Sequence, residues 1–135
     1  LEYLIPTDPV LAATPTELAQ LAPGMSINGV QFEFPADIAT IESGLQIAPI
    51  DFCGGHTNFN IGYHYHEDHG CIEGVAQCDD HAALIGYARD GFGIYEMANE
   101  AGVEPADLDE CRGHTDAIRG YHYHALGAGE GPPGE

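Results

Sequence analysis

The sequence predicts a mainly β protein built from short strands and hairpins, with little α-helix. Glycine and proline are frequent, with 18 and 9 among 135 residues, and the runs between them have strand length. A motif also occurs twice, as CGGHTNFNIGYHYH at 53–66 and CRGHTDAIRGYHYH at 111–124. The offset of 58 residues (111 − 53) also aligns Asp51 with Asp109. We therefore expect a tandem repeat, 51–66 and 109–124, whose units are related by a pseudo-twofold axis.

The chain length suits one domain with a single core. We expect residues 25–124 to form a single mainly-β domain that contains both repeats. Residues 1–24 are expected to hold an N-terminal strand, a linker and a short helix, and to be a possible assembly arm. Residues 125–135, ALGAGEGPPGE, lack apolar periodicity and are predicted to be a flexible tail.

The N-terminal strand is predicted from LEYLIP, in which Leu1, Tyr3 and Ile5 share one side of the chain and Pro6 ends the run. Such a strand has two interpretations. It folds back onto its own domain, or it completes the sheet of a neighbouring subunit, as in donor-strand assembly.

The later elements are predicted from caps, turns and alternation. Thr14-Pro15-Thr16-Glu17 has the pattern of a capped helix start. Asn28-Gly29 marks a turn before alternating apolar residues, and Arg89-Asp90-Gly91 lies between two apolar, aromatic runs. The resulting elements are a helix over 17–22, a strand pair that includes Val30, Phe32 and Phe34, a strand over 45–52, and a hairpin of 82–88 with 92–96.

The charge balance restricts the partners of this protein. Asp and Glu number 22 against 3 Lys and Arg, which gives a net charge of −19. Such a charge disfavours nucleic acid and anionic membranes as partners, and divalent cations, a basic partner or high salt would offset it. The alternative is an acidic surface that serves solubility. No apolar run approaches the roughly 20 residues of a membrane helix, so we expect no membrane span.

Four cysteines, an even number, are typical of a small exported domain with two disulfides. Of the three pairings, we favour Cys71 with Cys78, which closes a short loop, and Cys53 with Cys111, which could meet on the twofold axis. Alternatively, Cys53 and Cys111 ligate metal beside the histidines of their Cys-x2-His steps. We expect an extracellular protein with Leu1 at the start of its mature chain.

Six of the eight histidines lie inside the repeats, which is the main functional signal. Alternation along a strand places the two histidines of each Tyr-His-Tyr-His run on one face and the tyrosines on the other. A loop after each Gly-His step is expected to return a third ring over that face. The candidate ligands of copper or zinc are therefore His56, His64, His66, His114, His122 and His124.

These six rings could form one shared centre or two neighbouring ones, or a buried hydrogen-bonded network without metal. His69 and His81 lie outside the repeat and are interpreted as surface residues. Carboxylates near the motifs are candidates for calcium binding or for orienting the rings, although none has EF-hand spacing and each could simply be solvated. They are Glu67, Asp68, Asp79, Asp80, Asp107, Asp109 and Glu110.

No nucleophile elbow, phosphate-binding glycine loop or zinc-protease motif is present, so the sequence leaves catalysis uncertain and favours a protein that is not an enzyme. Thr7, Thr14 and Thr16 lie beside prolines, where O-linked glycans would be tolerated.

The two Gly-Tyr-His-Tyr-His segments, the preceding Cys-x-Gly-His-Thr, the LIGYARDGFGIYE between them and LDECRGH together resemble the YHYH domain family over about residues 51–124. The resemblance implies an exported protein with proposed metal binding, and its signature positions here are the six repeat histidines. The chain departs from the family where GAGEGPPGE replaces an aromatic strand ending in cysteine. The first fifty or so residues lie outside the resemblance.

From these observations we expect an exported structural protein that self-assembles into extracellular polymers. Assembly would use exchange of the N-terminal strand and bridging by calcium, with a histidine-lined site in each subunit. The alternative is a soluble extracellular protein that binds copper or zinc, or a metalloenzyme, through the same six histidines.

Overall fold

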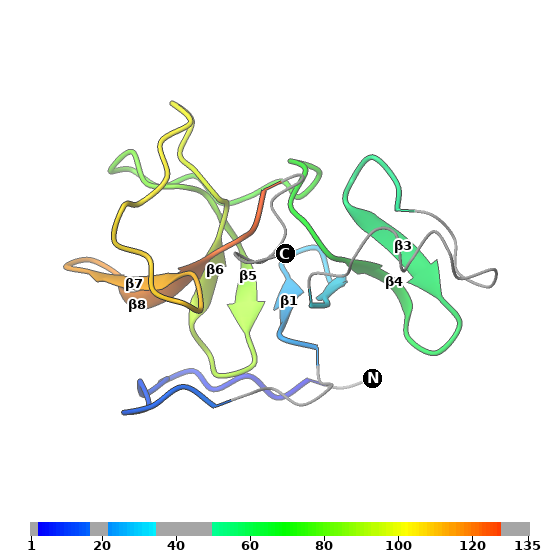
Figure 1. Cartoon of the computed structure of the whole chain (residues 1–135), viewed down its shortest axis with the longest axis horizontal. Helices are drawn as coiled ribbons and strands as arrows, with labels where there is room; N and C mark the ends of the chain where they lie inside the picture. Colours follow the sequence, from blue (N-terminus) through cyan, green and yellow to red (C-terminus); the bar gives the residue numbers. More distant parts are fainter. Residues whose placement is uncertain (1–2, 17–21, 35–49, 128–135) are drawn as a thin grey trace.

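The computed structural model describes residues 3–16, 22–34 and 50–127, which form eight strands in one sheet and contain no helix (Figure 1). The mainly β prediction is confirmed. The strands are β1 (Gly24–Ser26), β2 (Gln31–Phe32), β3 (Gly55–Asn58), β4 (Gly62–Tyr65), β5 (Leu84–Ala88), β6 (Gly93–Tyr95), β7 (Gly113–Asp116) and β8 (Gly120–His124). Except for Ala22, the helix expected over 17–22 lies outside the described residues.

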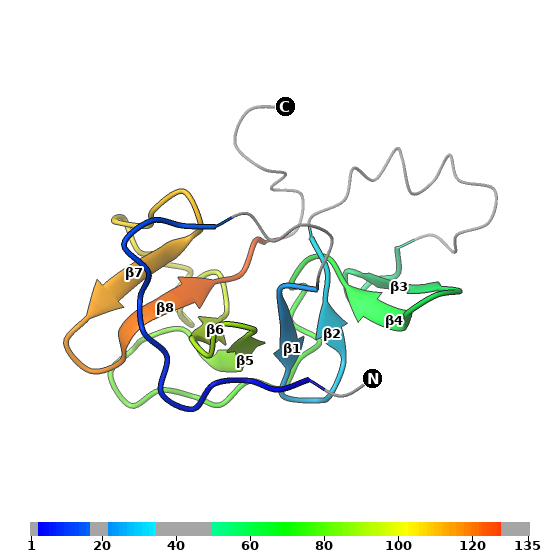
Figure 2. The ribbon, with the colours of Figure 1, turned by 90° about the horizontal axis from the view of Figure 1, so that it is seen from below.

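The strand order is β3-β4-β2-β1-β5-β6-β8-β7. Each half of this order holds one motif hairpin and one strand pair. β4 pairs in parallel with β2, as β8 does with β6, and the other neighbours are antiparallel. The motif hairpins consequently lie at opposite ends of the molecule (Figure 2). A pseudo-twofold axis between β1 and β5 would produce this order, and the axis itself stays a prediction.

Two glycines allow the central strands β1 and β5 to pack closely. A Cβ atom on Gly24 would lie 2.8 Å from Cδ1 of Ile94, and one on Gly86 would lie 2.7 Å from Cε2 of Phe32. Both pairs share one offset, since 86 − 24 and 94 − 32 each equal 62. Each half therefore inserts one large side chain against the central glycine of the other, where any Cβ would overpack the contact.

The core is small and follows the middle of the sheet. Tyr65, Ile72 and Ile85 are buried together, and Ile85 is fully inaccessible. Complete burial of a side chain of this size contributes about 1.5–3 kcal/mol. Partly buried neighbours complete the cluster, namely Val30, Phe32, Cys53, Ile94 and Ala125. The core thus draws on strands from both halves, which ties them into one unit.

Both hairpins predicted outside the motifs are present. The Asn28-Gly29 turn joins β1 to β2, and residues 89–92 join β5 to β6. Of the strand expected over 45–52, residues 45–49 lie outside the described part and residues 50–52 form no strand. Of the predicted tail, Leu126 and Gly127 are tied to Asp68, through an Asp68 N–H donated to the Leu126 carbonyl (3.2 Å) and a bridge to Gly127.

The N-terminal segment lies against its own domain. Residues 3–5, for which the sequence predicts a strand, pair with no described strand, and Leu1 lies outside the described residues. The Tyr3 hydroxyl donates to Oε1 of Gln31 (2.7 Å), and the Arg89 guanidinium lies 6.0 Å from the Tyr3 ring. In Figure 2 the blue segment then runs from the β1 side toward the end that carries β7 and β8.

Both predicted disulfide pairings are wrong, because the structure joins Cys53 to Cys71. Cys111 and Cys53 precede the outermost strands β7 and β3, so the width of the sheet separates them. The segment before Cys78 lies beside β5, where Val75 pairs with Leu84, and Cys78 is not bonded to Cys71. Cys78 and Cys111 are both exposed free thiols.

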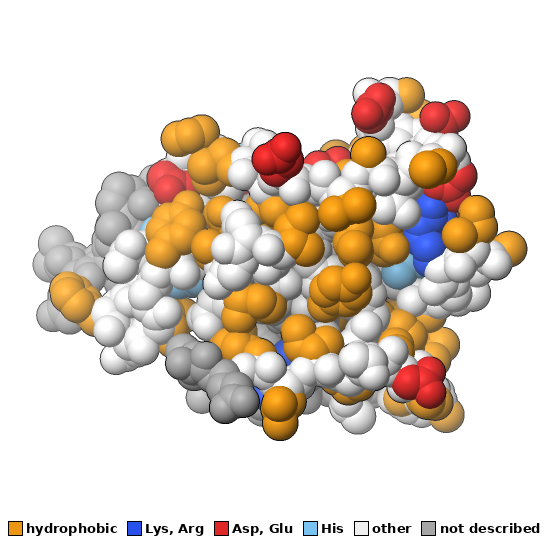
Figure 3. All heavy atoms as spheres, turned by 180° about the vertical axis from the view of Figure 1, so that it is seen from behind, with side chains coloured by type: hydrophobic (Ala, Val, Ile, Leu, Met, Phe, Trp, Pro, Cys, Tyr) orange, Lys and Arg blue, Asp and Glu red, His pale blue; other side chains and the backbone are white. Residues whose placement is uncertain are grey.

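The surface mixes apolar and acidic groups. In the view from behind, hydrophobic side chains spread across the middle of the molecule, and most of the acidic groups lie nearer its rim (Figure 3). Exposed large apolar residues include Phe52, which precedes β3, and Phe59 and Ile118, which lie in the turns of the two motif hairpins.

Candidate metal centres

The six predicted histidines gather into two clusters rather than one shared centre. The first cluster contains His56, His64 and His66, and within it the candidate ligand atoms all lie within 4.8 Å of one another. The second cluster meets the same criterion and contains His81, His114, His122 and His124. His56, His64, His122 and His124 are buried, and the other three are partly exposed.

The β3–β4 hairpin builds the first cluster. His56 lies directly opposite His64 in the antiparallel ladder, so a strand and not a returning loop presents this third ring. The alternation of the Tyr-His-Tyr-His run is as predicted. The rings of His64 and His66 are 4.8 Å apart, and those of Tyr63 and Tyr65 are 5.5 Å apart on the other side of the strand.

The β7–β8 hairpin repeats this arrangement. His114 lies opposite His122, and the rings of His122 and His124 are 5.3 Å apart. The rings of Tyr121 and Tyr123 are also 5.3 Å apart. The duplicated sequence therefore places three imidazoles in the same register in each half.

A tyrosine and an aspartate fix the start of each hairpin. In the first, the Tyr63 hydroxyl donates to Oδ2 of Asp51 (2.7 Å), whose Oδ1 accepts from the backbone of Cys53 (2.9 Å) and Gly55 (3.2 Å). Burial alone would raise the pKa of Asp51, but these hydrogen bonds lower it. A Cβ on Gly55 would lie 2.7 Å from the Tyr63 hydroxyl, which explains the glycine before His56.

The second hairpin begins with the same tyrosine–aspartate hydrogen bond, an arrangement that we call the lock. The Tyr121 hydroxyl donates to Oδ2 of Asp109 (2.8 Å), and Oδ1 accepts from the Cys111 and Gly113 backbone (2.9 Å each). Burial opposes these bonds, and the pKa of Asp109 is again lowered. Asp109, predicted as a calcium or ring-orienting ligand, instead holds the strand that presents His114.

In the first cluster, hydrogen bonds to backbone carbonyls set the ring tautomers. Nδ1 of His64 donates to the Gly62 carbonyl (3.0 Å), and Nδ1 of His66 donates to the Phe34 carbonyl (2.6 Å). In a neutral ring this leaves Nε2 as a lone-pair donor to a metal. Nε2 of His66 lies 3.0 Å from Nε2 of His64 and 3.1 Å from Nε2 of His56.

Every ring of the second cluster is anchored in the same way. The acceptors of the four Nδ1–H groups are the Ala82 carbonyl for His81 (3.0 Å), the Asp107 carboxylate for His114 (2.9 Å), the Gly120 carbonyl for His122 (2.9 Å) and the Glu96 carbonyl for His124 (2.8 Å). Such partners fix ring orientation and tautomer in metal sites.

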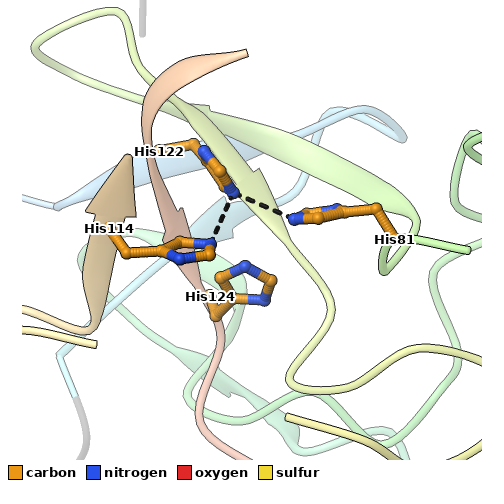
Figure 4. Close-up of side chains that lie close together, drawn as sticks. All are labelled: His81, His114, His122 and His124. Atoms are coloured by element: carbon orange, nitrogen blue, oxygen red, sulfur yellow. Dashed lines mark hydrogen bonds between the residues drawn. The ribbon is translucent and has the colours of Figure 1, made fainter. Parts of the chain in front are cut away.

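The free ring nitrogens of the second cluster converge. Nε2 of His122 lies 3.0 Å from Nε2 of His81 and 3.0 Å from Nε2 of His114 (Figure 4). Nε2 of His124 is buried and has no hydrogen-bond partner among the described residues. A buried, unpaired lone pair is unfavourable, and it lies here beside three other ring nitrogens.

Burial disfavours the charged form of four of the rings. It lowers the pKa of His64, His66 and His122, and it lowers that of His124 to about 4. Nε2 of His64 and Nε2 of His66, whose Nδ1 atoms carry the ring protons, then face each other as two lone pairs. Two nitrogens on one ion, each about 2.0–2.1 Å from it, are separated by about 2.9 Å in a square plane and about 3.4 Å in a tetrahedron. The observed 3.0–3.1 Å fits this range.

The surface interpretation of His81 is wrong, because this residue completes the second cluster. It precedes β5 in the segment between the halves, and no motif or periodicity in the sequence marks it. His69 joins neither cluster. Its Nε2 pairs with Oε2 of Glu67 (2.8 Å), which raises the pKa of His69, and its Nδ1 bonds the Phe52 carbonyl (3.0 Å).

The other predicted carboxylates do not converge. Asp68 accepts from the Gly70 backbone, Asp79 pairs with Arg119, and Asp107 supports His114. Asp80 and Glu110 belong to neither cluster. In the part of the chain that the structure describes, both groups of three or more converging ligand atoms consist of histidines alone. The thiolate alternative is also not supported, since Cys53 is in a disulfide and Cys111 joins neither cluster.

A family model described as "YHYH protein" matches residues 2–107. The match includes the N-terminal fifty residues, which the sequence resemblance had left out, and it ends before the second copy of the motif. No curated protein and no solved structure matches the chain significantly. Within the described ranges, no helix is long and apolar enough to cross a bilayer.

Proposed function

The chain belongs to the YHYH protein family, and we propose that it functions by binding two transition-metal ions, one in each histidine cluster. One observation carries this proposal. Each ring whose Nδ1 partner is described donates that Nδ1–H to an oxygen and directs Nε2 toward the other rings of its cluster. A cation between buried lone pairs that meet in this way would stabilise them.

The donor set favours copper or zinc. Neutral imidazole suits first-row ions such as Cu²⁺ and Zn²⁺, whereas Ca²⁺ requires six to eight oxygen ligands. No carboxylate belongs to either described cluster. Calcium between subunits, expected from the acidic composition, would need ligands from more than one chain and stays a prediction.

The two centres differ in ligand number. The second has four histidines, which fill a tetrahedral or square-planar ion. The first has three, and the one histidine of the sequence outside both clusters, His69, is paired with Glu67. A three-histidine ion with an open position is the arrangement that metalloenzymes use, so the enzyme alternative is confined to the first centre.

The wider role expected from the sequence also stays a proposal. A disulfide is typical of an oxidising compartment, which supports an extracellular location. For polymer assembly, the described contacts of the N-terminal segment, such as the Tyr3–Gln31 hydrogen bond, lie within its own chain. The N-terminal strand exchange would therefore require this segment to leave its present position.

Metal titration tests the proposed function. Apo-protein is titrated with Cu²⁺ and, separately, Zn²⁺ in a calorimeter, and bound metal is measured after gel filtration. We expect two ions per wild-type chain, and one ion each for His64→Ala and for the variant that carries both His122→Ala and His124→Ala. The variant that combines all three changes should bind none.

His69→Ala is the matched control, because it removes a histidine outside both clusters and should still bind two ions. Circular dichroism verifies that each variant is folded. Folded wild-type protein that binds neither metal at micromolar concentrations would contradict the proposal. So would binding that both ligand variants leave unchanged.

A further inference from the structure

The fourth histidine of the second cluster is held in place from outside the cluster. His81 lies in the segment between the two halves, two residues after Asp79. The guanidinium of Arg119, in the turn between β7 and β8, pairs with Asp79 through Nη2 and with Asp116 through Nη1. Arg119 thereby links the segment that carries His81 to the hairpin that carries the other ligands.

The side chain of Arg119 is largely covered, with 8 % of it exposed. Its guanidinium lies 5.7 Å from the Tyr95 ring centroid. The Tyr95 ring in turn lies 4.8 Å from the His81 ring and 5.0 Å from the His122 ring. Figure 3 shows basic side chains beside histidine at the end of the molecule that carries β7 and β8. Asp79 itself is exposed, but an arginine that is paired with two carboxylates at once restrains them more than an isolated surface ion pair does.

The first half lacks an arginine that pairs with two carboxylates at this position. At the offset of 58, Arg119 corresponds to Ile61 (119 − 58) and Asp116 to Asn58 (116 − 58). An isoleucine cannot bind a carboxylate, and the first described cluster contains no fourth histidine. We call the pairing of Arg119 with Asp79 and Asp116 the Arg119 clamp. The clamp and the fourth histidine occur together in one half, and both are missing from the described part of the other.

We propose that Arg119 is a positioning residue that sets the coordination number of the second centre. Through Asp79 it holds His81 as the fourth ligand and so closes the second metal ion to small external ligands. The first ion keeps one position for water or a small anion. This inference rests on the proposed metal binding. It adds that the first ion can exchange external ligands, that the second cannot, and that Arg119 causes this difference.

Azide binding to the copper-loaded protein tests the proposal. His64→Ala serves as the parent, so that only the second centre reports. Azide on an accessible Cu²⁺ gives a charge-transfer absorption band, and we expect none in the parent. His81→Ala should give the band, and Arg119→Leu should give it too while keeping His81.

Affinity provides a second readout. Loss of an orienting partner should weaken copper binding at this centre by about 10- to 100-fold in Arg119→Leu. Arg119→Lys, which keeps a cation that can pair with Asp79, should recover part of this loss. Arg89→Leu is the matched control, because it removes the same charge at a residue that contacts the N-terminal segment. It should behave like the parent.

The outcomes separate the two proposals. A parent that binds no copper would overturn the proposed function and this inference with it. A parent that binds copper, together with an Arg119→Leu variant that binds copper equally well and excludes azide, would overturn this inference alone. If Arg119→Leu does not fold, Asp79→Asn breaks the same link from the other side. That folded variant should bind azide, and its failure to do so would also overturn the inference.

Discussion

The two motif hairpins share a scaffold and differ in what surrounds it. Both place three histidines in one register, and both lock the strand entry with a tyrosine–aspartate hydrogen bond of 2.7–2.8 Å. Only the first is tied by the Cys53–Cys71 disulfide, and only the second has His81 and the Arg119 clamp. Each hairpin thus brings three imidazoles together, and the segment between the halves adds a fourth only to the second cluster.

Removing the Cys53–Cys71 disulfide should destabilise the first half more than the second. A cross-link with a sequence separation of 18 stabilises the fold by about 3 kcal/mol through loop-closure entropy. We expect the Cys53→Ser, Cys71→Ser variant to lose about this much free energy of unfolding, measured by urea denaturation of the apo-protein. Copper binding at the first centre should weaken more than at the second.

Cys111→Ser is the control for this change, because it alters the corresponding position of the second half, where the thiol is free. It should leave the urea midpoint unchanged. Equal weakening of both centres in the double variant would mean that the halves unfold as a single unit.

The central glycines test how alike the halves are where they meet. Gly86→Ala would place a methyl group against the Met25 carbonyl and Phe32, and Gly24→Ala would place one against the Tyr87 carbonyl and Ile94. Overpacking of this kind costs about 1–3 kcal/mol, so each variant should show a lower urea midpoint. Similar losses would support the predicted twofold relation, and a loss in only one variant would argue against it. Gly29→Ala is unsuitable as a control. Gly29 has φ of 85°, a left-handed conformation in which alanine is strained, so this variant would lose stability for a different reason.

The smallest expected effect is on the pH dependence of stability. The folded-state pKa values of Asp51 and Asp109 are lowered, so both carboxylates stabilise the fold at a pH above their ordinary pKa of about 4. This stabilisation is lost as the pH falls through the lowered values. Metal-free Asp51→Asn and Asp109→Asn should therefore be slightly less stable than wild type at pH 7, and the difference should shrink as the pH falls below about 4.

Thermal denaturation between pH 7 and pH 3 measures these differences. The two variants should behave alike, because the locks are alike. A difference that grows as the pH falls would contradict the assigned sign of both shifts.

The sequence predicted what the motif itself encodes. Alternation placed His64 with His66 and Tyr63 with Tyr65, because side-chain direction in a strand depends only on position. The turn residues also located the β1–β2 and β5–β6 hairpins. These features are local, so a single sequence suffices to predict them.

Features that depend on distant pairing were not predicted. His81 acquires its role because β5 lies beside β6 and β6 beside β8, a strand order that the sequence does not specify. The disulfide was assigned wrongly for the same reason, since Cys53 and Cys111 are alike in sequence yet precede opposite edges of the sheet. Arg119 stood out only as one of three basic residues, and its partner Asp79 is 40 residues away.

The antiparallel pairing of β1 with β5 has an evolutionary consequence. A chain with only one half could cover this central strand by pairing with a second copy of itself, and in such a symmetric dimer every substitution would occur in both histidine clusters. Joining the halves in one chain removes that constraint. One cluster can then have a fourth histidine while the other half has a disulfide, which is the difference between the halves of this molecule.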